Sequence, residues 1–254
     1  MDYNAVSVVI PCYNEEGNLK RGVLDQVDNF LKKQTFQWEV IIANDHSSDQ
    51  SLKLIQNFIK NHDKFRVLDL PHGGKPSAVY AGIKAAKYNF ALFTDMDQST
   101  PISELIKLMP YLRDFDLIIG SRGTTRSGNN LLRRLGARIF LTLRRWIILP
   151  EINDTQCGFK IIRTDLAKKI FPRLSFFQEN IKGGWRVSAF DVEMLFMAQK
   201  WGYKIKEVPV LWQNQDISQT KGNRTNNYFK ESIQMIKEIW QVRKNDYHGK
   251  YEKK

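Results

Sequence analysis

The first hundred residues alternate short runs of β-branched and aromatic residues with segments of helical periodicity. The strand-like runs cover residues 6–10, 38–43, 65–70 and 90–94. The helical segments between them cover residues 15–32, 51–61 and 77–87. Strands that alternate with helices are typical of β-α-β units, in which the strands run parallel. The sequence therefore predicts an α/β fold whose doubly wound, mostly parallel sheet carries helices on both faces.

The length of the chain limits how many domains it can form. A chain of 254 residues with ordinary globular composition suits one large α/β domain with a small appendage. We assign residues 1–218 to this domain, including an amphipathic segment at 130–149, and residues 219–254 to a C-terminal helix and charged tail. Residues 243–254 are charged and lack apolar spacing, so we expect them to fray.

Cysteine usage and apolar runs bear on the cellular setting. Cys12 and Cys157 lie far apart in sequence, so they form neither a metal-spaced pair nor a disulfide framework. A reducing setting is the simpler interpretation, although a single disulfide stays open. The N-terminus has no signal-peptide pattern, and no uncharged apolar run approaches the roughly 18 to 20 residues that cross a bilayer. If this protein meets a membrane, we therefore expect it to lie on the membrane surface.

The polar segments that follow the predicted strands are candidates for a binding site. In open α/β sheets, ligands bind beyond the carboxyl ends of the strands. The segments in this position are 11–15, 44–49, 72–75 and 95–97. Asp95 and Asp97 supply oxygen ligands that suit Mg²⁺ or Mn²⁺, and such ions also accept oxygens from a substrate diphosphate. By itself this pair is equally typical of a solvated turn.

Two other strand-end segments favour a phosphorylated nucleotide. Asp45 could accept hydrogen bonds from a base or ribose, whereas Asp49 could instead cap the helix that begins at Ser51. The sequence Gly-Gly-Lys at 73–75 could bring the Lys75 cation to a phosphate, but it lacks the spacing of a Walker loop. The first strand is not followed by a Gly-x-Gly-x-x-Gly pattern, which argues against a dinucleotide enzyme.

The formal net charge of +12 indicates an anionic partner: nucleic acid, a phosphorylated substrate or acidic lipid. A helical projection of residues 131–149 puts five arginines on one side and apolar residues on the other. The arginines are Arg133, Arg134, Arg138, Arg144 and Arg145. Such a helix is typical of a membrane interface, the alternative being a packed surface helix with a solvated basic face. Basic residues beside an apolar stripe, without a recognised reader motif, disfavour a nucleic-acid partner.

Taken together, the motifs have a recognisable pattern between about Val6 and Ser218. They lie at residues 8–16, 44–49, 74–75, 95–101, 120–122, 154–160, 190–193 and 202–210. This pattern resembles glycosyltransferase family 2, in particular its polyprenyl- and dolichyl-phosphate glycosyltransferases, and most of all the dolichyl-phosphate β-glucosyltransferases. The resemblance implies a GT-A fold and an inverting transfer from a nucleotide-diphosphate sugar.

The resemblance also implies roles for individual residues. Those implied at the nucleotide are Pro11, Tyr13, Glu15, Asp45, Lys75 and Asp95. Asp95, Asp97 and Ser99 are the implied ligands of Mg²⁺ or Mn²⁺, with Asp97 most directly on the metal. Arg122, Arg133 and Arg138 would face the acceptor phosphate. Asp154 matches a carboxylate proposed as catalytic in relatives, and we interpret it as orienting the arginines or the acceptor.

Some positions depart from the family pattern. The usual Asp-Asp pair reads Asn44-Asp45, which removes one carboxylate near the nucleotide. Ala137 stands where some mannosyl relatives have a phosphate-binding serine, which favours glucose from UDP-glucose over mannose from GDP-mannose. Many relatives carry C-terminal membrane spans. The sequence of this chain shows no such span, so we expect the amphipathic segment to provide access to the lipid.

The resulting hypothesis is a peripheral enzyme on the cytoplasmic side of a membrane with an anionic surface. It would move a hexose onto a polyprenyl or dolichyl phosphate. Two alternatives stay open: a family 2 transferase that acts on a soluble glycan or protein, and a transferase-like fold without activity. The presence of Asp95, Asp97 and Lys75 argues against the second.

Overall fold

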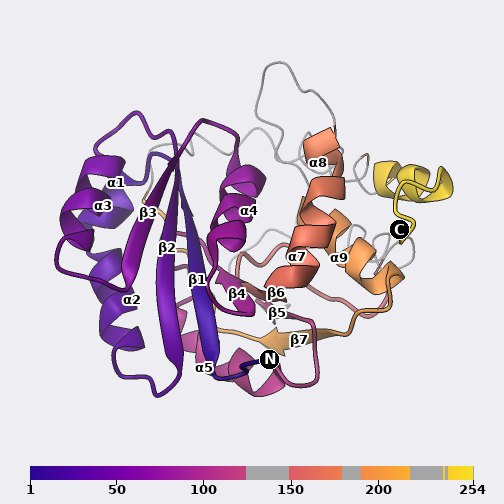
Figure 1. The fold of residues 1–254 in the computed structure, drawn as a ribbon, viewed down its shortest axis with the longest axis horizontal. Coiled ribbons are helices and arrows are strands. Elements are labelled where there is room, and N and C mark those ends of the chain that lie inside the picture. The colour runs from indigo at the N-terminus through magenta and orange to yellow at the C-terminus, as the bar shows by residue number, and fades with distance from the viewer. Residues whose placement is uncertain (124–148, 179–189, 218–236, 238–239, 254) are drawn as a thin grey trace, which may run out of the picture.

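A seven-stranded sheet forms the centre of the computed structural model, which describes residues 1–123, 149–178, 190–217, 237 and 240–253 (Figure 1). The order of strands across the sheet is β3-β2-β1-β4-β6-β5-β7. The strands are β1 (Ala5–Cys12), β2 (Gln37–Asp45), β3 (Phe65–Leu70), β4 (Phe90–Phe93), β5 (Leu117–Ser121), β6 (Lys160–Arg163) and β7 (Ile205–Pro209). The predicted strands of the first hundred residues are all present, each within a few residues of its expected bounds.

The pairing of the strands divides the sheet into two parts. In the first part, β3, β2, β1 and β4 pair in parallel, and their carboxyl ends meet at one edge. In the second part, β6 runs antiparallel to both β4 and β5, while β5 and β7 pair in parallel. The mostly parallel α/β fold that the sequence predicts is confirmed, with β6 as its antiparallel member.

Helices cover both faces of this sheet. The labelled α-helices of the described ranges are α1 (Glu16–Lys20), α2 (Val23–Leu31), α3 (Ser51–Ile59), α4 (Lys75–Ala85), α5 (Leu105–Leu108), α7 (Thr164–Ile170), α8 (Ser175–Gln178) and α9 (Phe190–Lys200), and residues 240–247 are also helical. Short 3-10 turns lie at η1 (Ile102–Glu104), η2 (Met109–Tyr111) and η3 (Phe171–Arg173). The prediction of one helix over 15–32 is wrong, because Gly22 adopts a left-handed φ of 79° and separates α1 from α2.

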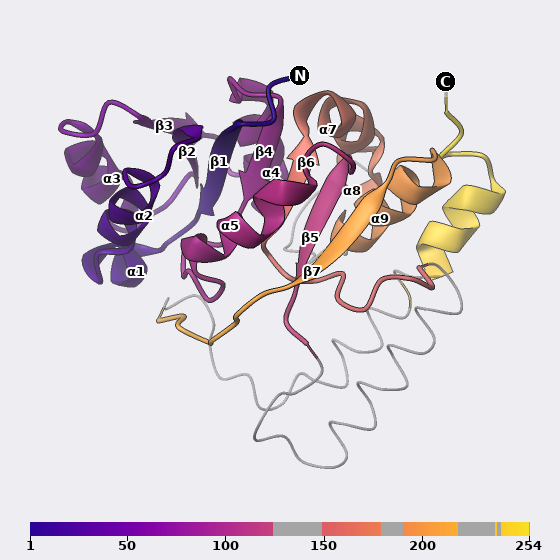
Figure 2. The ribbon, with the colours of Figure 1, turned by 90° about the horizontal axis from the view of Figure 1, so that it is seen from below.

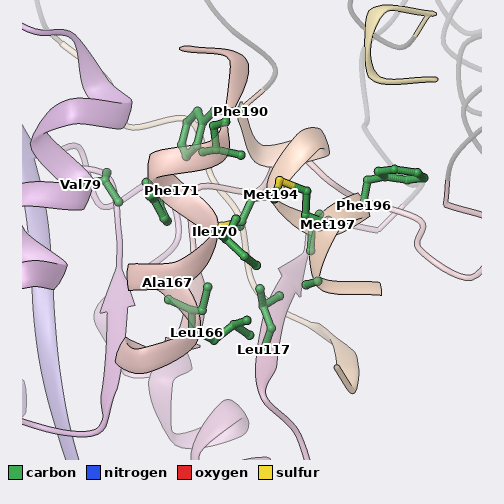
Figure 3. Close-up of a cluster of buried hydrophobic side chains, with 14 of the residues drawn as sticks. Val79, Leu117, Leu166, Ala167, Ile170, Phe171, Phe190, Met194, Phe196 and Met197 are labelled. Atoms are coloured by element: carbon green, nitrogen blue, oxygen red, sulfur yellow. The ribbon is translucent and has the colours of Figure 1, made fainter. Parts of the chain in front are cut away.

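Alternating side chains of the strands build two hydrophobic cores. On β1, Val9 points to the core beneath α4, α7 and α9, whereas Val8 and Ile10 point to the core beneath α2, α3 and α5. Figure 3 shows part of the first core, where Leu166 and Ile170 of α7 lie beside the side chains of α9. The two cores bury the sheet on both sides, so that polar side chains gather where the strands end.

The C-terminal segment packs beside α9 in both ribbon views (yellow in Figures 1 and 2). Tyr251 is only 1% exposed, and its hydroxyl donates to Glu193 Oε1 at 2.5 Å. Its carbonyl oxygen accepts a bond from Trp201 Nε1 at 2.8 Å. The prediction that 243–254 frays is therefore wrong for the described part of this segment. Val242 and Tyr251 are its two buried hydrophobic anchors, and two isolated anchors produce no periodicity in the sequence.

None of the helices in the described ranges is both long and apolar enough to cross a membrane. The predicted amphipathic segment at 130–149, with Arg133 and Arg138, lies outside the described residues apart from its last position, Leu149.

Candidate functional site

An ion pair between Lys75 and Asp95 lies where β4 ends and α4 begins. Lys75 Nζ is 2.5 Å from Asp95 Oδ1, and both side chains are partly exposed, at 42% and 41%. Removal from water lowers the pKa of Lys75, but attraction from Asp95 and Asp191 outweighs this effect and raises the pKa to about 12. Lys75 therefore carries a positive charge at any physiological pH.

Asp97 and Ser99 lie deeper in the same loop. Asp97 is buried, and its Oδ1 accepts the backbone N–H of Ser99 at 2.8 Å. Gln98, between them, adopts a φ of 49°, and its side-chain amide donates to the carbonyl oxygen of Asp95 at 2.9 Å. These bonds hold the two carboxylates in one turn. Ser99 Oγ accepts the backbone N–H of Gln215 at 3.3 Å, so its role as a metal ligand stays a prediction.

Asp45 orders the glycine loop that precedes Lys75. Its Oδ1 accepts the N–H of Gly73 at 2.6 Å, and its Oδ2 accepts the N–H of Gly74 at 2.9 Å. His72 Nδ1 lies 3.1 Å from Oδ2. Gly74 has a φ of 79°, a conformation that favours glycine at the start of α4. In this arrangement the buried Asp45 fixes the loop that presents Lys75, whereas contact with a base or ribose stays a prediction.

The segment after β1 carries the other residues expected at the nucleotide. Pro11 pairs with Ala43 of β2 within the sheet, and the ring of Tyr13 lies 4.9 Å from that of His72. Glu15 accepts a bond from Asn18 Nδ2 at 2.6 Å. Of these residues Tyr13 contacts the glycine loop, through His72, as expected for strands whose carboxyl ends meet.

Serines and an aspartate join the β1 and β2 ends. Asn14, at a φ of 53°, donates its N–H to Ser47 Oγ at 3.0 Å, and the N–H of Glu15 donates to Ser51 Oγ at 2.8 Å. Asp49 accepts from the N–H groups of Glu16 and Ser51 at 3.1 and 2.9 Å. Asp49 thus serves the first turns of α1 and α3, which agrees with the capping alternative considered from the sequence.

A second charged pair lies beyond β5. Asp154 accepts from the Nε and Nη2 atoms of Arg122 at 2.7 and 2.8 Å, and also from its backbone N–H at 3.0 Å. Burial raises the pKa of Asp154, but the bonds to Arg122 outweigh it and lower the pKa to about 2. Glu207 of β7 accepts a hydrogen bond from the backbone N–H of Asp154 through its Oε1 at 2.8 Å. The pair is therefore fixed from both sides.

The two charged groups lie within electrostatic reach of each other. Burial lowers the pKa of Arg122, but Asp154, with a smaller contribution from Asp95, raises it overall. The structure thus brings together two predicted regions that are separate in sequence. Arg133 and Arg138, the other arginines expected at the acceptor, lie outside the described residues.

Lys160 and Asp191 are charged residues near this site to which the sequence analysis assigned no role. Lys160 is fully buried, and its Nζ donates to Asp191 Oδ1 at 2.7 Å and to the carbonyl oxygen of Cys157 at 2.5 Å. Lysine is almost never fully buried without a partner. The available signal was a lysine between Phe159 and Ile161 at the start of β6, but its partner on α9 could not be identified from spacing.

The chain that leaves β7 returns along the site toward α1 (orange in Figure 2). Gln213 N–H donates to the carbonyl oxygen of Ser99 at 2.7 Å, and Arg21 donates to Gln215 Oε1 at 2.8 Å. Arg21 also donates to the carbonyl oxygen of Asp97 at 2.7 Å. Residues 210–217 therefore buttress the turn that carries Asp97.

The carboxylates of this site fit a divalent cation that a substrate helps to bind. Among the residues that the structure describes, no three His, Cys, Asp or Glu side chains form a metal-binding group. Two carboxylates, Asp95 and Asp97, are however a sufficient protein contribution where phosphate oxygens supply further ligands, as is usual for Mg²⁺. The donor set is thus suited to Mg²⁺ or Mn²⁺ together with a diphosphate.

Comparison with solved structures identifies the type of fold. A glucosyl-3-phosphoglycerate synthase from Mycobacterium tuberculosis, solved with Mn²⁺, UDP and glucosyl-3-phosphoglycerate, superposes with a TM-score of 0.63 at 16% identity, over 94% of this chain and 79% of that one. A mannosyltransferase from Pyrobaculum calidifontis, solved with GDP-Man and Mn²⁺, superposes with a TM-score of 0.61 at 14% identity, over 96% of this chain and 64% of that one. These likenesses confirm the GT-A type of fold.

Sequence comparison identifies the family. Dolichyl-phosphate beta-glucosyltransferase of Dictyostelium discoideum is 31% identical over 259 residues, which cover 94% of this chain and 73% of that protein. The protein of the same name from Drosophila melanogaster is 32% identical over 232 residues, which cover 84% and 68%. Residues 7–171 match the family described as glycosyl transferase family 2. The chain therefore belongs to glycosyl transferase family 2.

Proposed function

We propose that this chain transfers glucose from UDP-glucose to a polyprenyl or dolichyl phosphate at a membrane surface. The observation that carries the proposal is that the segment with the Lys75–Asp95 pair packs against the segment that follows Asp154, the partner of Arg122. Thr100 Oγ1 lies 3.8 Å from Cys157 Sγ, and Asp95 lies against Gly158. Transfer between two phosphorylated molecules needs one cationic group for the departing diphosphate and another for the acceptor. The names of the relatives favour glucose and a dolichyl phosphate.

On the donor side, Lys75 would bind the diphosphate and stabilise the charge that develops there. Its flexible side chain can exchange the partly exposed Asp95 for a phosphate oxygen. Asp95 and Asp97 would hold Mg²⁺ or Mn²⁺, an ion that offsets negative charge on a leaving diphosphate when it is bound. Tyr13 and Pro11 would line the position of the base, because both lie at the end of β1 and the ring of Tyr13 contacts His72 of the glycine loop.

On the acceptor side, Arg122 would orient the lipid phosphate, and Asp154 would orient Arg122. A phosphate oxygen forms a bond to the anomeric carbon while the bond from that carbon to the diphosphate oxygen breaks, and the nucleoside diphosphate leaves with the electron pair. Attack opposite the leaving group inverts the configuration. Because the acceptor phosphate is already anionic near neutral pH, no strong base is needed, and alignment of the reactants contributes several kcal/mol.

Access to the lipid would depend on the predicted amphipathic segment at 130–149. Arg133 and Arg138 would bind the lipid phosphate, and the apolar side would enter the interface of the bilayer. Vesicles that contain anionic lipid should retain the protein at low salt and release it at high salt. Formation of lipid-linked product without any vesicle binding would contradict this part of the proposal.

The proposal is tested by incubating the protein with radiolabelled UDP-glucose or GDP-mannose, a divalent cation and a short polyprenyl phosphate. We expect label from UDP-glucose to enter the organic phase, and Asp97→Asn to abolish this product. Product from GDP-mannose, with none from UDP-glucose, would show that the donor sugar is mannose and not glucose. Label on a soluble glycan, with none on the lipid, would overturn the lipid acceptor.

A further inference from the structure

We propose that Gly158 is a positioning residue for the Asp95 carboxylate, an inference that rests on the proposed donor site. A Cβ atom placed on Gly158 would lie 2.1 Å from Asp95 Oδ2 and 2.6 Å from its Cγ. No side chain larger than a hydrogen can occupy this position while Asp95 stays where it is. Glycine at 158 thus provides the space into which Asp95 fits.

The requirement for glycine arises from this space and not from the backbone. The φ angle of Gly158 lies outside the left-handed range, unlike the φ angles of Gly22 and Gly74. Alanine could therefore adopt the backbone conformation at 158 without strain. The three atoms nearest to the added Cβ all belong to the carboxyl group of Asp95, so this group is sufficient to exclude a methyl.

The backbone around Gly158 is held on both sides and cannot easily move away. The carbonyl oxygen of Cys157 accepts a bond from the buried Lys160 Nζ at 2.5 Å, and that of Phe159 accepts the N–H of Gly120 at 2.8 Å. The side chains of Cys157 and Phe159 are fully buried in the core. A methyl group at 158 would consequently displace Asp95 and not the chain.

Displacement of Asp95 would change the donor site directly. Its Oδ1 lies 2.5 Å from Lys75 Nζ, while its Oδ2 is the atom that faces Gly158. The main chain of Asp95 is anchored, because its carbonyl oxygen accepts two bonds from Gln98. The carboxylate can therefore yield only by rotating, which moves it relative to both Lys75 and Asp97. Gly158 thereby couples the segment before β6 to the geometry of the proposed cation site.

A double-mutant cycle tests the inference without relying on sugar transfer. Mn²⁺ binding is measured by electron paramagnetic resonance in the presence of UDP, for the wild type, Gly158→Ala, Asp95→Ala and the double variant. We expect Gly158→Ala to weaken Mn²⁺ binding about tenfold or more, as loss of support for a ligand commonly does. In the Asp95→Ala background the same substitution should have no further effect, because the group it displaces is gone.

Gly82→Ala is the matched control, since its added Cβ would lie 2.3 Å from Val9 Cγ1 in the core beneath α4. It should lower the melting temperature while the folded protein keeps its Mn²⁺ affinity. Wild-type Mn²⁺ affinity in Gly158→Ala, or an equal loss in both backgrounds, would overturn the inference.

Failure of the proposed function would give a different result. If the wild type bound no Mn²⁺, the cation site would be refuted, and the same cycle would be read from melting temperatures. A loss of stability in Gly158→Ala that disappears in the Asp95→Ala background would still support the positioning of Asp95 by Gly158. A loss of equal size in both backgrounds would refute it.

Discussion

Asp95 follows β4 and Asp154 precedes β6 in the same sheet, yet the two carboxylates are held in opposite ways. Asp95 is 41% exposed and, within the part of the chain that the structure describes, pairs with one cation, the flexible Lys75. Asp154 is 14% exposed and accepts two side-chain bonds and one backbone bond from Arg122. A bidentate arginine pair is planar and directional, whereas a lysine pair constrains direction weakly.

This difference indicates which group can change partners during a reaction. A partly exposed lysine pair contributes little to stability, so Lys75 can leave Asp95 for a phosphate at small cost. Separation of Asp154 from Arg122 would leave two largely buried charges without partners, which is far less favourable. We infer that the Asp95 side of the site rearranges around a donor, while the Asp154 side is a fixed support.

The largest effect is expected at Asp97, on the exchangeable side. Asp97→Ala removes a carboxylate that we assign to the cation site, and transfer should fall by about a thousandfold or more. The fold should persist, because Arg21 and Gln98 also hold this turn through the backbone carbonyl oxygens of Asp97 and Asp95. The turnover rate and the circular dichroism spectrum are measured together. Full activity of this variant in metal-free buffer would show that transfer does not require a divalent cation.

Arg122→Lys should have the next largest effect, because lysine cannot reproduce the bidentate contact with Asp154. We expect kcat/KM for the lipid acceptor to fall about a hundredfold while the KM for the sugar nucleotide changes little. Arg163→Lys is the matched control, since Arg163 similarly binds Asp116 and Asp165 at the opposite end of β6. An equal loss in both variants would show that Arg122 acts only on stability.

A smaller effect should appear in the dependence of stability on pH. Arg122 lowers the pKa of Asp154 from 3.8 to about 2 in the folded protein. The stabilisation from this pair is therefore complete above about pH 4 and is lost as the pH falls toward 2. Denaturant unfolding between pH 2 and 6 should show a steeper loss for the wild type than for Asp154→Asn. Parallel curves would contradict the assignment.

The same pKa predicts how activity varies with pH. Asp154 stays ionised throughout the range from pH 5 to 8, so it cannot produce a titration step there. An acidic limb of the rate profile with a midpoint near pH 6 that disappears in Asp154→Asn would identify Asp154 as a titrating base instead of a support.

The smallest effect is expected far from both carboxylates, at the C-terminal segment. Tyr251→Phe removes the bond to Glu193 but keeps the buried ring, which should cost about 1 kcal/mol of stability. For a chain of this size the melting temperature should fall by roughly 2 to 4 °C. Kinetic constants for both substrates should stay unchanged. A change in the KM for the sugar nucleotide would show that this segment also takes part in the rearrangement around the donor.

Local sequence was sufficient for the part of the site that consists of strand ends. Asp95, Asp97, Asp45 and Lys75 follow strands or open a helix in a parallel sheet, and that topology alone brings them to one edge. The resemblance supplied Asp154 and Arg122, although their direct contact is known only from the structure. Parallel strand order therefore carries much of the information about the donor side.

Contacts that depend on tertiary packing could not be predicted in this way. Gly158 meets Asp95, and Lys160 meets Asp191, only because β6 inserts antiparallel between β4 and β5. The anchoring of Tyr251 depends on Glu193 of α9, a residue distant in sequence. Spacing and periodicity report which face a residue occupies, but they do not identify its partner across the fold.

In the proposed function, Asp95 and Asp97 beyond β4 hold a divalent cation together with a nucleoside diphosphate. Isothermal titration of UDP into the wild type and Asp97→Ala, with Mn²⁺ or with EDTA, tests it most directly. We expect Mn²⁺ to strengthen UDP binding to the wild type at least tenfold and Asp97→Ala to lose most of this gain. Equal dissociation constants with Mn²⁺ and with EDTA in the wild type would contradict it.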